Sequence, residues 1–181
     1  MIPASFVNTF WDEGKGYLAD VVYGQNKDWS VRPNQIIAAS LPYRAIDEGI
    51  CMGVVNVVQK ELLTPRGLRT LSPKNINFKG TYAGNQPDRD RAYHQGTVWP
   101  WLFGHFAEAY LRIHGKEGVP YIKERYQGFE EVMTEAGIGS ISEVYDGDPP
   151  HLAGGTISQA WSVSELLRTH ALIEKYNKKR K

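Results

Sequence analysis

Apolar residues recur at helical spacing along most of the chain. In residues 98–113, "VWPWLFGHFAEAYLRI", they fall on nearly every side, which predicts an inner helix packed by neighbours all round. Thr97 is predicted to cap the start of this helix, with Pro100 inside its first turn, where a missing N–H costs little. Residues 119–133 carry a single apolar stripe between charged positions, and this pattern predicts an outer helix with one buried face.

Three further segments show the same period. Helices are predicted over 33–40, 45–62 and 156–176, the first opening on a proline and the last following a pair of glycines. The many valines of 45–62 leave a strand as the alternative for that segment. Because no sustained two-residue alternation occurs, the predicted fold class is all-α.

Two stretches between the predicted helices are rich in polar, glycine and proline residues. They are residues 64–96 and 138–155. The first is too long for an ordinary connection between helices. Long loops on a rigid scaffold commonly carry binding groups, so both stretches are expected to form functional surface.

Composition narrows the range of partners and cofactors. The chain has 181 residues, 41% of them hydrophobic, and its formal charge of +1 favours neither nucleic acid nor an anionic membrane. Cys51 is the only cysteine, which excludes an internal disulfide and a multi-cysteine zinc site, and neither metal nor cofactor is predicted. The basic tail "KYNKKRK" is interpreted as a solvated helix end. If Met1 is the native start, the lack of a leader-like segment predicts a cytoplasmic location.

The segment "DRDRAYHQGTVWPW" gathers acidic, basic, amide, imidazole and indole groups around one predicted helix start. Its members include Asp90, Tyr93, His94, Gln95 and Trp99. Sugars need such a mixture, because aromatic faces cover their C–H surfaces while fixed polar groups bind their hydroxyls. The cluster therefore predicts a polyol site. The alternative is that the indoles are core, Asp90 pairs with a neighbouring arginine and His94 bonds a backbone carbonyl.

The carboxylates of "ISEVYDGDPP" are a second candidate for chemistry. Ser142 has no nucleophile-elbow motif, "GKG" at 14–16 lacks the Walker spacing, and "DGDPP" lacks the ligand spacing of a calcium loop. Acid/base chemistry fits better, because glycoside hydrolysis uses one carboxylic acid and one carboxylate. Glu143 stands among apolar residues just before a turn. Its alternative is a solvated surface glutamate, with Asp146 and Asp148 binding at most an adventitious cation.

Five motifs in order resemble the C-terminal region of glycogen debranching enzymes, in their amylo-alpha-1,6-glucosidase domain. They are "FWDEGKGYLADVV", "RPNQIIAASLP", "LLTPRGLRTLSP", "RDRAYHQGTVWPWL" and "ISEVYDGDPPHLAGGTISQAWSVSELLR". Together they span nearly the whole chain. The resemblance implies an (α/α)6 barrel and inverting hydrolysis of the α-1,6-linked glucose at glycogen or limit-dextrin branch points.

The resemblance also implies roles for individual residues. Glu143 matches the glutamate taken as general base. The glucose subsite would be lined by Tyr93, His94, Gln95, Trp99, Gln159 and Trp161, and Asp146 would orient the loop or a sugar hydroxyl. Weaker candidates are Asp90, Arg32, Asn34 and Gln35, of which the last three stand where they could equally tie helix ends together.

The chain departs from the family pattern in one respect. The family's general acid is an aspartate in a motif upstream of "FWDEG", and no segment here resembles that motif. A six-hairpin toroid needs about twelve helices near the usual length of ~11 residues, whereas periodicity predicts about six. Residues 1–181 are therefore expected to be one unit, the C-terminal half of the barrel.

This expectation has consequences for partners and activity. The upstream half of the barrel and an α-glucan are the predicted partners, and the isolated chain is expected to be nearly inactive and to self-associate through uncovered helix faces. Two alternatives stand beside it. In the first alternative the chain is a non-catalytic α-glucan-binding or scaffold domain. In the second it is a complete glycosidase whose general acid is a residue such as Asp12 or Asp90.

Overall fold

The computed structural model describes residues 2–178, so Met1 and the last three residues of the basic tail lie outside it. The helices are α1 (Ile2–Phe10), α2 (Asn34–Ser40), α3 (Glu48–Glu61), α4 (Gln86–Ala92), α5 (Leu102–His114), α6 (Val119–Gln127), α7 (Phe129–Val132) and α8 (Ala160–Lys178), with a 3-10 turn η1 at Gly115–Gly118. The strands are β1 (Trp11–Asp12), β2 (Tyr17–Leu18), β3 (Val21–Tyr23), β4 (Asn26–Asp28), β5 (Leu63–Thr64), β6 (Gly67–Arg69), β7 (Val98–Trp99), β8 (Val144–Tyr145) and β9 (Ala153–Gly154).

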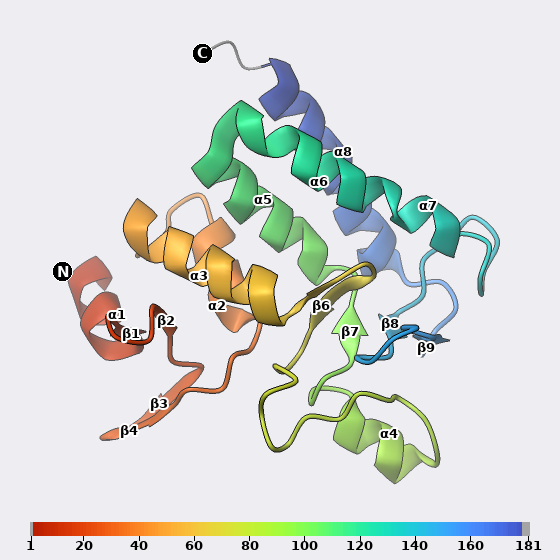
Figure 1. The fold of residues 1–181 in the computed structure, drawn as a ribbon, viewed down its shortest axis with the longest axis horizontal. Coiled ribbons are helices and arrows are strands. Elements are labelled where there is room, and N and C mark those ends of the chain that lie inside the picture. The colour runs from red at the N-terminus through yellow and green to blue at the C-terminus, as the bar shows by residue number, and fades with distance from the viewer. Residues whose placement is uncertain (1, 179–181) are drawn as a thin grey trace.

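Helix α5 is the centre of the helical layer. It packs against α2, α3, α6 and α8, and Figure 1 shows α3, α5, α6 and α8 running side by side. Phe103, Phe106 and Leu111 are fully buried along it. A helix with neighbours on every side needs apolar residues on every side, so the prediction of an inner helix here is confirmed.

Helix α3 settles the choice between helix and strand at residues 45–62 in favour of the helix. Asp47 caps its start by accepting a hydrogen bond from the Ile50 backbone N–H at 2.9 Å. Ile50, Val54 and Val58 then form a buried stripe at a spacing of four residues. The valines are tolerated because burial of this stripe outweighs the small helix preference that β-branching costs.

Two predicted helix starts are too early by four residues. Thr97 does not cap a helix; its hydroxyl donates to the Ala92 carbonyl at 2.8 Å, and the chain then forms β7 before α5 begins at Leu102. Helix α8 begins at Ala160 rather than at residue 156. Val98 and Trp99 pair in the sheet, whereas residues 156–159 form an irregular segment whose Thr156 carbonyl and Gln159 N–H bond the backbone of Glu143 and Ile141. A helical pattern reveals neither arrangement.

The predicted outer helix over 119–133 is interrupted. It forms α6 and α7, which meet at Gly128. The break rotates the apolar stripe, so that Val132 is buried at 2% exposure while Met133, predicted for the stripe, is 36% exposed.

The all-α class is confirmed only in part, because short strands accompany the helices. β5 to β9 form one antiparallel five-stranded sheet in sequence order, and the hairpins β1–β2 and β3–β4 stand apart from it. Each strand has only two or three residues, too few for a two-residue alternation to show in the sequence. Leu68 pairs with Trp99, and Val98 pairs with Tyr145.

The sheet lies where several helices begin or end. β5 follows α3, β7 leads to α5, and β9 leads to α8, so the sheet sits at one end of the helical layer (Figure 1). The two polar loops predicted as functional surface are therefore brought to the same end. Among residues 2–178, no helix combines the length and apolar character that crossing a bilayer requires.

Candidate functional site

The Glu143 carboxylate is held by three donors from two distant segments. Its Oε1 accepts a hydrogen bond from the Tyr93 hydroxyl. Its Oε2 accepts from the Thr156 backbone N–H at 2.9 Å and from the Thr156 hydroxyl at 3.1 Å. The Glu143 backbone N–H also donates to the Thr156 carbonyl at 2.9 Å. The side chain is half-buried and fixed at both oxygens.

These donors decide the protonation state of the site. Burial alone would raise the pKa of Glu143, but the hydrogen bonds from Tyr93 and Thr156 outweigh it and hold the pKa below its ordinary value. The pKa of Tyr93 is raised, first by burial and then by its bond to the carboxylate. At neutral pH the pair is therefore a carboxylate and a neutral phenol, and the phenol donates.

A glycine lets the carboxylate occupy this position. Gly155 adopts φ +67°, a left-handed conformation that residues with a side chain rarely adopt. A Cβ at Gly155 would stand 2.5 Å from Oε2 of Glu143. A glycine is therefore required at position 155 for two reasons: it allows the turn, and it leaves the space that the Glu143 side chain occupies.

Aromatic rings connect the carboxylate to a hollow at the start of α5. The Tyr93 ring lies edge-on to Trp99 with centroids 4.7 Å apart, and the His94 ring stacks on Trp99 at 5.6 Å. Trp161 contacts Trp99 edge-on at 5.5 Å and stacks on Trp101 at 5.7 Å. Glu143 itself does not line the hollow and reaches it through Tyr93 and Trp99.

The hollow has a volume of about 220 Å³ and mixes apolar and polar groups. Its lining residues are Pro33, Asn34, Ile37, Thr70, His94, Trp99, Trp101, Leu102 and Trp161. No carboxylate is among the described residues that line it. Indole faces with an imidazole, an amide and a hydroxyl are suited to bind a small polyol.

Arg32 joins the segments on which the site is built. Its guanidinium donates to the carbonyls of Thr70 at 3.1 Å and His94 at 2.6 Å, and to the Gln95 side-chain oxygen at 2.8 Å. The predicted candidates Arg32 and Gln95 are thus brought together, and the hydrogen bonds of Arg32 tie backbone segments to each other. Asn34, whose amide donates to Asp20 at 2.7 Å, lines the hollow.

Four other predicted site residues of the described chain make no hydrogen bond to the Glu143 carboxylate. Gln35 is buried, and its amide nitrogen donates to the Arg32 carbonyl at 3.2 Å. Gln159 binds the backbone N–H of its own neighbour at 3.0 Å. Asp146 accepts from the Tyr82 backbone N–H at 2.7 Å, so its carboxylate orients a loop. Asp90 is exposed on α4.

Sequence reasoning missed two residues of this site. Thr156 supplies two of the three bonds to Glu143, and Tyr82 packs against Tyr93 with ring centroids 5.7 Å apart. A hydroxyl directly after two glycines is a usable signal for Thr156, because glycine-rich turns bring backbone and side-chain donors close to a ligand or a neighbour. Tyr82 carries no comparable signal.

Metal binding has no support in this part of the chain. Among residues 2–178, no group of three or more His, Cys, Asp or Glu side chains is arranged to hold a metal ion. Cys51 is buried on α3, and burial raises the pKa of its thiol. A buried, protonated thiol is a packing residue rather than a nucleophile.

Comparisons with known proteins place the chain among glycosidase-type domains. It belongs to the amylo-alpha-1,6-glucosidase family, whose model matches residues 1–168. The glycogen debranching enzyme of Saccharomyces cerevisiae is 25% identical over 162 residues, which are 78% of this chain and 10% of that protein. The neutral trehalase of the same yeast has a similar fold, with a TM-score of 0.61 at 17% identity over 96% of this chain and 29% of its own. The chain therefore spans about a tenth of the length of this curated relative.

Proposed function

We propose that this chain is the base-bearing part of an inverting glucosidase that removes the α-1,6-linked glucose at branch points of an α-glucan. The observation that carries the proposal is the Glu143 carboxylate, ionised, fixed at both oxygens and bonded to Tyr93, whose ring packs on Trp99 at the border of a small hollow. Membership of the amylo-alpha-1,6-glucosidase family supports the bond and the substrate.

In the proposed reaction Glu143 removes a proton from water, and the water oxygen attacks the anomeric carbon. The glycosidic bond breaks as a second carboxylic acid protonates the leaving oxygen. An inverting pair stands about 6.5–9.5 Å apart on opposite sides of that bond, so one glutamate cannot fill both roles. We place the acid on the upstream half of the barrel. Asp90 fits the role poorly, because it is exposed on α4.

The packing of the helices supports the half-barrel. α5 lies between α2 and α8, and these three helices would form the inner ring, with α3 and α6 outside them. The similarity to the trehalase covers only 29% of the trehalase chain, which agrees with a barrel whose remaining helices are supplied by another segment. Leu167 on α8 is 65% exposed and Ile157, just before it, is 63% exposed. We expect the upstream half to cover these residues, and the isolated chain to self-associate through them.

The test of the base is Glu143→Gln in the chain rejoined to the upstream half, with glucose release from a limit dextrin as the readout. The amide cannot accept the water proton, so turnover should fall by at least about a hundredfold. Glu131→Gln, an exposed glutamate on α7, is the matched control and should leave turnover unchanged. Near-normal turnover in Glu143→Gln would refute the assignment.

A second candidate function is a non-catalytic α-glucan-binding domain. The hollow favours it, because aromatic and polar groups line it and no carboxylate does so among the described residues. Calorimetry of malto-oligosaccharides with the isolated chain, followed by assay of the rejoined protein, separates the two. Binding that persists without hydrolysis in the rejoined protein favours the second candidate.

A further inference from the structure

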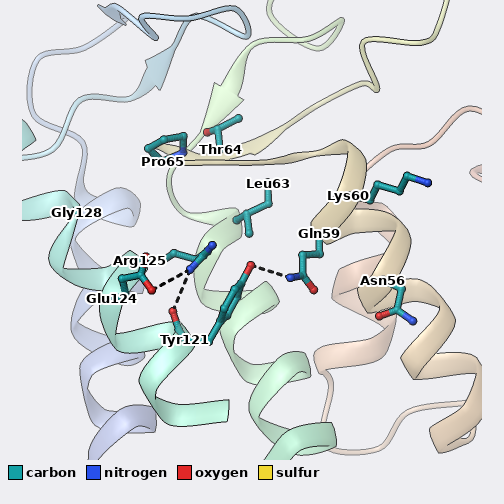
Figure 2. A pocket seen from close by; sticks show the side chains of 10 residues that line it. All are labelled: Asn56, Gln59, Lys60, Leu63, Thr64, Pro65, Tyr121, Glu124, Arg125 and Gly128. Atoms are coloured by element: carbon teal, nitrogen blue, oxygen red, sulfur yellow. Dashed lines mark hydrogen bonds and ion pairs between the residues drawn. The ribbon is translucent and has the colours of Figure 1, made fainter.

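A cavity between α3 and α6 is separate from the Glu143 site. It has a volume of about 580 Å³ and lies between the end of α3, the turn after β5, and α6 (Figure 2). Its lining residues are Asn56, Gln59, Lys60, Leu63, Thr64, Pro65, Tyr121, Glu124, Arg125 and Gly128. None of them contacts Glu143 or lines the hollow at α5. The volume is within the range of about 300–1,000 Å³ that small-ligand sites occupy.

Two polar side chains meet in this cavity and keep spare hydrogen-bonding capacity. The Gln59 amide nitrogen donates to the Tyr121 hydroxyl at 2.8 Å, as Figure 2 shows. Because the hydroxyl accepts this bond, its own proton remains available to a ligand. The Gln59 amide oxygen has no hydrogen-bond partner among residues 2–178. The pair therefore offers one donor and one acceptor side by side.

Arg125 adds further hydrogen-bond donors, and its guanidinium is held in place by stacking on the Tyr121 ring. Its guanidinium lies 3.5 Å from the Tyr121 ring centroid, and Tyr110 stacks on the same ring at 4.7 Å. The polar contacts of the guanidinium are long, 3.5 Å to the Tyr121 carbonyl and 3.7 Å to the Glu124 carboxylate. A guanidinium has five N–H donors, so most of those of Arg125 are free to bind a ligand.

The charges around Arg125 favour a neutral ligand over an anion. The Glu124 carboxylate stands beside the guanidinium and would repel an anionic group there. Lys60 is at the edge of the cavity, and Figure 2 shows its side chain extending away from Tyr121. Leu63 and Pro65 supply an apolar wall opposite these polar groups. Donors, an acceptor and an apolar wall with little net charge match the two sides of a glucose ring, its hydroxyls and its C–H faces.

We propose that this cavity is a second carbohydrate site, which binds a linear stretch of the α-glucan away from the Glu143 site. The nature of the ligand rests on the proposed function. Two sites on one domain engage the same polymer at once, so the second engagement is intramolecular and raises the affinity for long chains above that for short ones. The domain would thereby stay on the polymer while the branch point is presented elsewhere.

The experiment measures the binding of unbranched maltohexaose to the 181-residue chain by calorimetry. Tyr121→Phe removes only the hydroxyl, and Arg125→Ala removes the guanidinium while leaving Tyr121 on Tyr110. Each should weaken binding by roughly tenfold, the value of one hydrogen bond to a charged or fixed polar group. Lys123→Ala, an exposed charge on the same helix outside the cavity, is the matched control and should bind like the unmodified chain. Circular dichroism establishes that each variant is folded.

The outcomes distinguish this proposal from the proposed function. Trp161→Ala alters the hollow at α5 and should leave part of the maltohexaose binding intact. If binding disappears in Trp161→Ala and is unchanged in Tyr121→Phe and Arg125→Ala, the cavity is not a carbohydrate site, whereas the glucosidase proposal stands. If the unmodified chain does not bind maltohexaose, the cavity proposal is overturned. Failure of the Glu143→Gln test would overturn the glucosidase and leave a measured cavity affinity in place.

Discussion

Replacing Tyr93 with phenylalanine tests whether the carboxylate of Glu143 is held in the ionised state by its neighbours. The substitution deletes the hydroxyl that donates to Glu143 Oε1 and keeps the ring that packs on Trp99 at 4.7 Å and on His94 at 4.9 Å. The two bonds from Thr156 to Oε2 remain. Loss of one donor to the charged form therefore raises the pKa of Glu143 towards its ordinary value.

The magnitude follows from the type of bond that is lost. A hydrogen bond to a charged group contributes about 1.5–3 kcal/mol, and the lower end applies because the half-buried carboxylate gains water in place of the phenol. We expect the free energy of unfolding to fall by about 1.5 kcal/mol near pH 7. Because the folded-state pKa of Glu143 is lowered, this contribution is present above the ordinary value of 4.5 and is lost as the pH falls through the folded-state value.

Urea unfolding of the chain and of Tyr93→Phe, near pH 7 and at about pH 3, measures this difference. The gap in unfolding free energy between the two proteins should be large near neutrality and should shrink in acid. Tyr43→Phe is the matched control, since Tyr43 is 97% exposed, and it should leave the free energy unchanged at both values. A gap of the same size at both pH values would show that the hydroxyl does not act through the charge of Glu143.

Two further substitutions test the local geometry and the core. Gly155→Ala places a Cβ 2.5 Å from Glu143 Oε2 at a residue with φ +67°, so we expect it to displace the carboxylate, to cost about 1–2 kcal/mol in backbone strain and to abolish glucose release by the rejoined protein. Phe106→Ala empties a fully buried position of α5 and should lower the free energy of unfolding by about 3–5 kcal/mol, measured as a shift of the urea midpoint. A stable, fully active Gly155→Ala, or an unchanged midpoint for Phe106→Ala, would contradict the packing described.

The sequence predicts the long helices α3, α5 and α8 well and their first turns poorly, but it does not predict α1 or α4, the second of which lies in the stretch 64–96 expected to be a loop. The period of the apolar residues reports which face of α3 or α5 is buried, because that periodicity is a local property of the chain. Strand pairing is not local. Val98 and Trp99 look like the first turn of α5 in the sequence, but they pair with Tyr145 and Leu68, which lie more than thirty positions away in either direction. Two-residue strands leave no periodicity from which such partners can be found.

In the candidate site, too, local features could be predicted from the sequence and contacts between distant segments could not. The sequence alone predicts that Tyr93, His94 and Trp99 form one cluster, because they are neighbours in the chain. The bond from Tyr93 to Glu143 joins residues fifty positions apart. The residues around Glu143 made it an acid/base candidate, but nothing in the sequence indicated that Tyr93 would bind it. The two glycines before Thr156 indicate a turn, but the partner of the Thr156 donors depends on the direction in which Gly155 turns the backbone, and the sequence does not give that direction.

The small sheet, more than the helices, sets the geometry of the site. Tyr93 lies a few residues before β7, and Glu143 immediately precedes β8. The pairing of Val98 with Tyr145 brings these two segments together. Gly147 fixes how closely they pack, because a Cβ there would lie 2.4 Å from the Gly96 carbonyl oxygen. A slip of one residue in this pairing would turn each side chain to the opposite face of its strand and separate the phenol from the carboxylate. The helices supply the stability of the domain, and two-residue strands supply the register on which the proposed base depends.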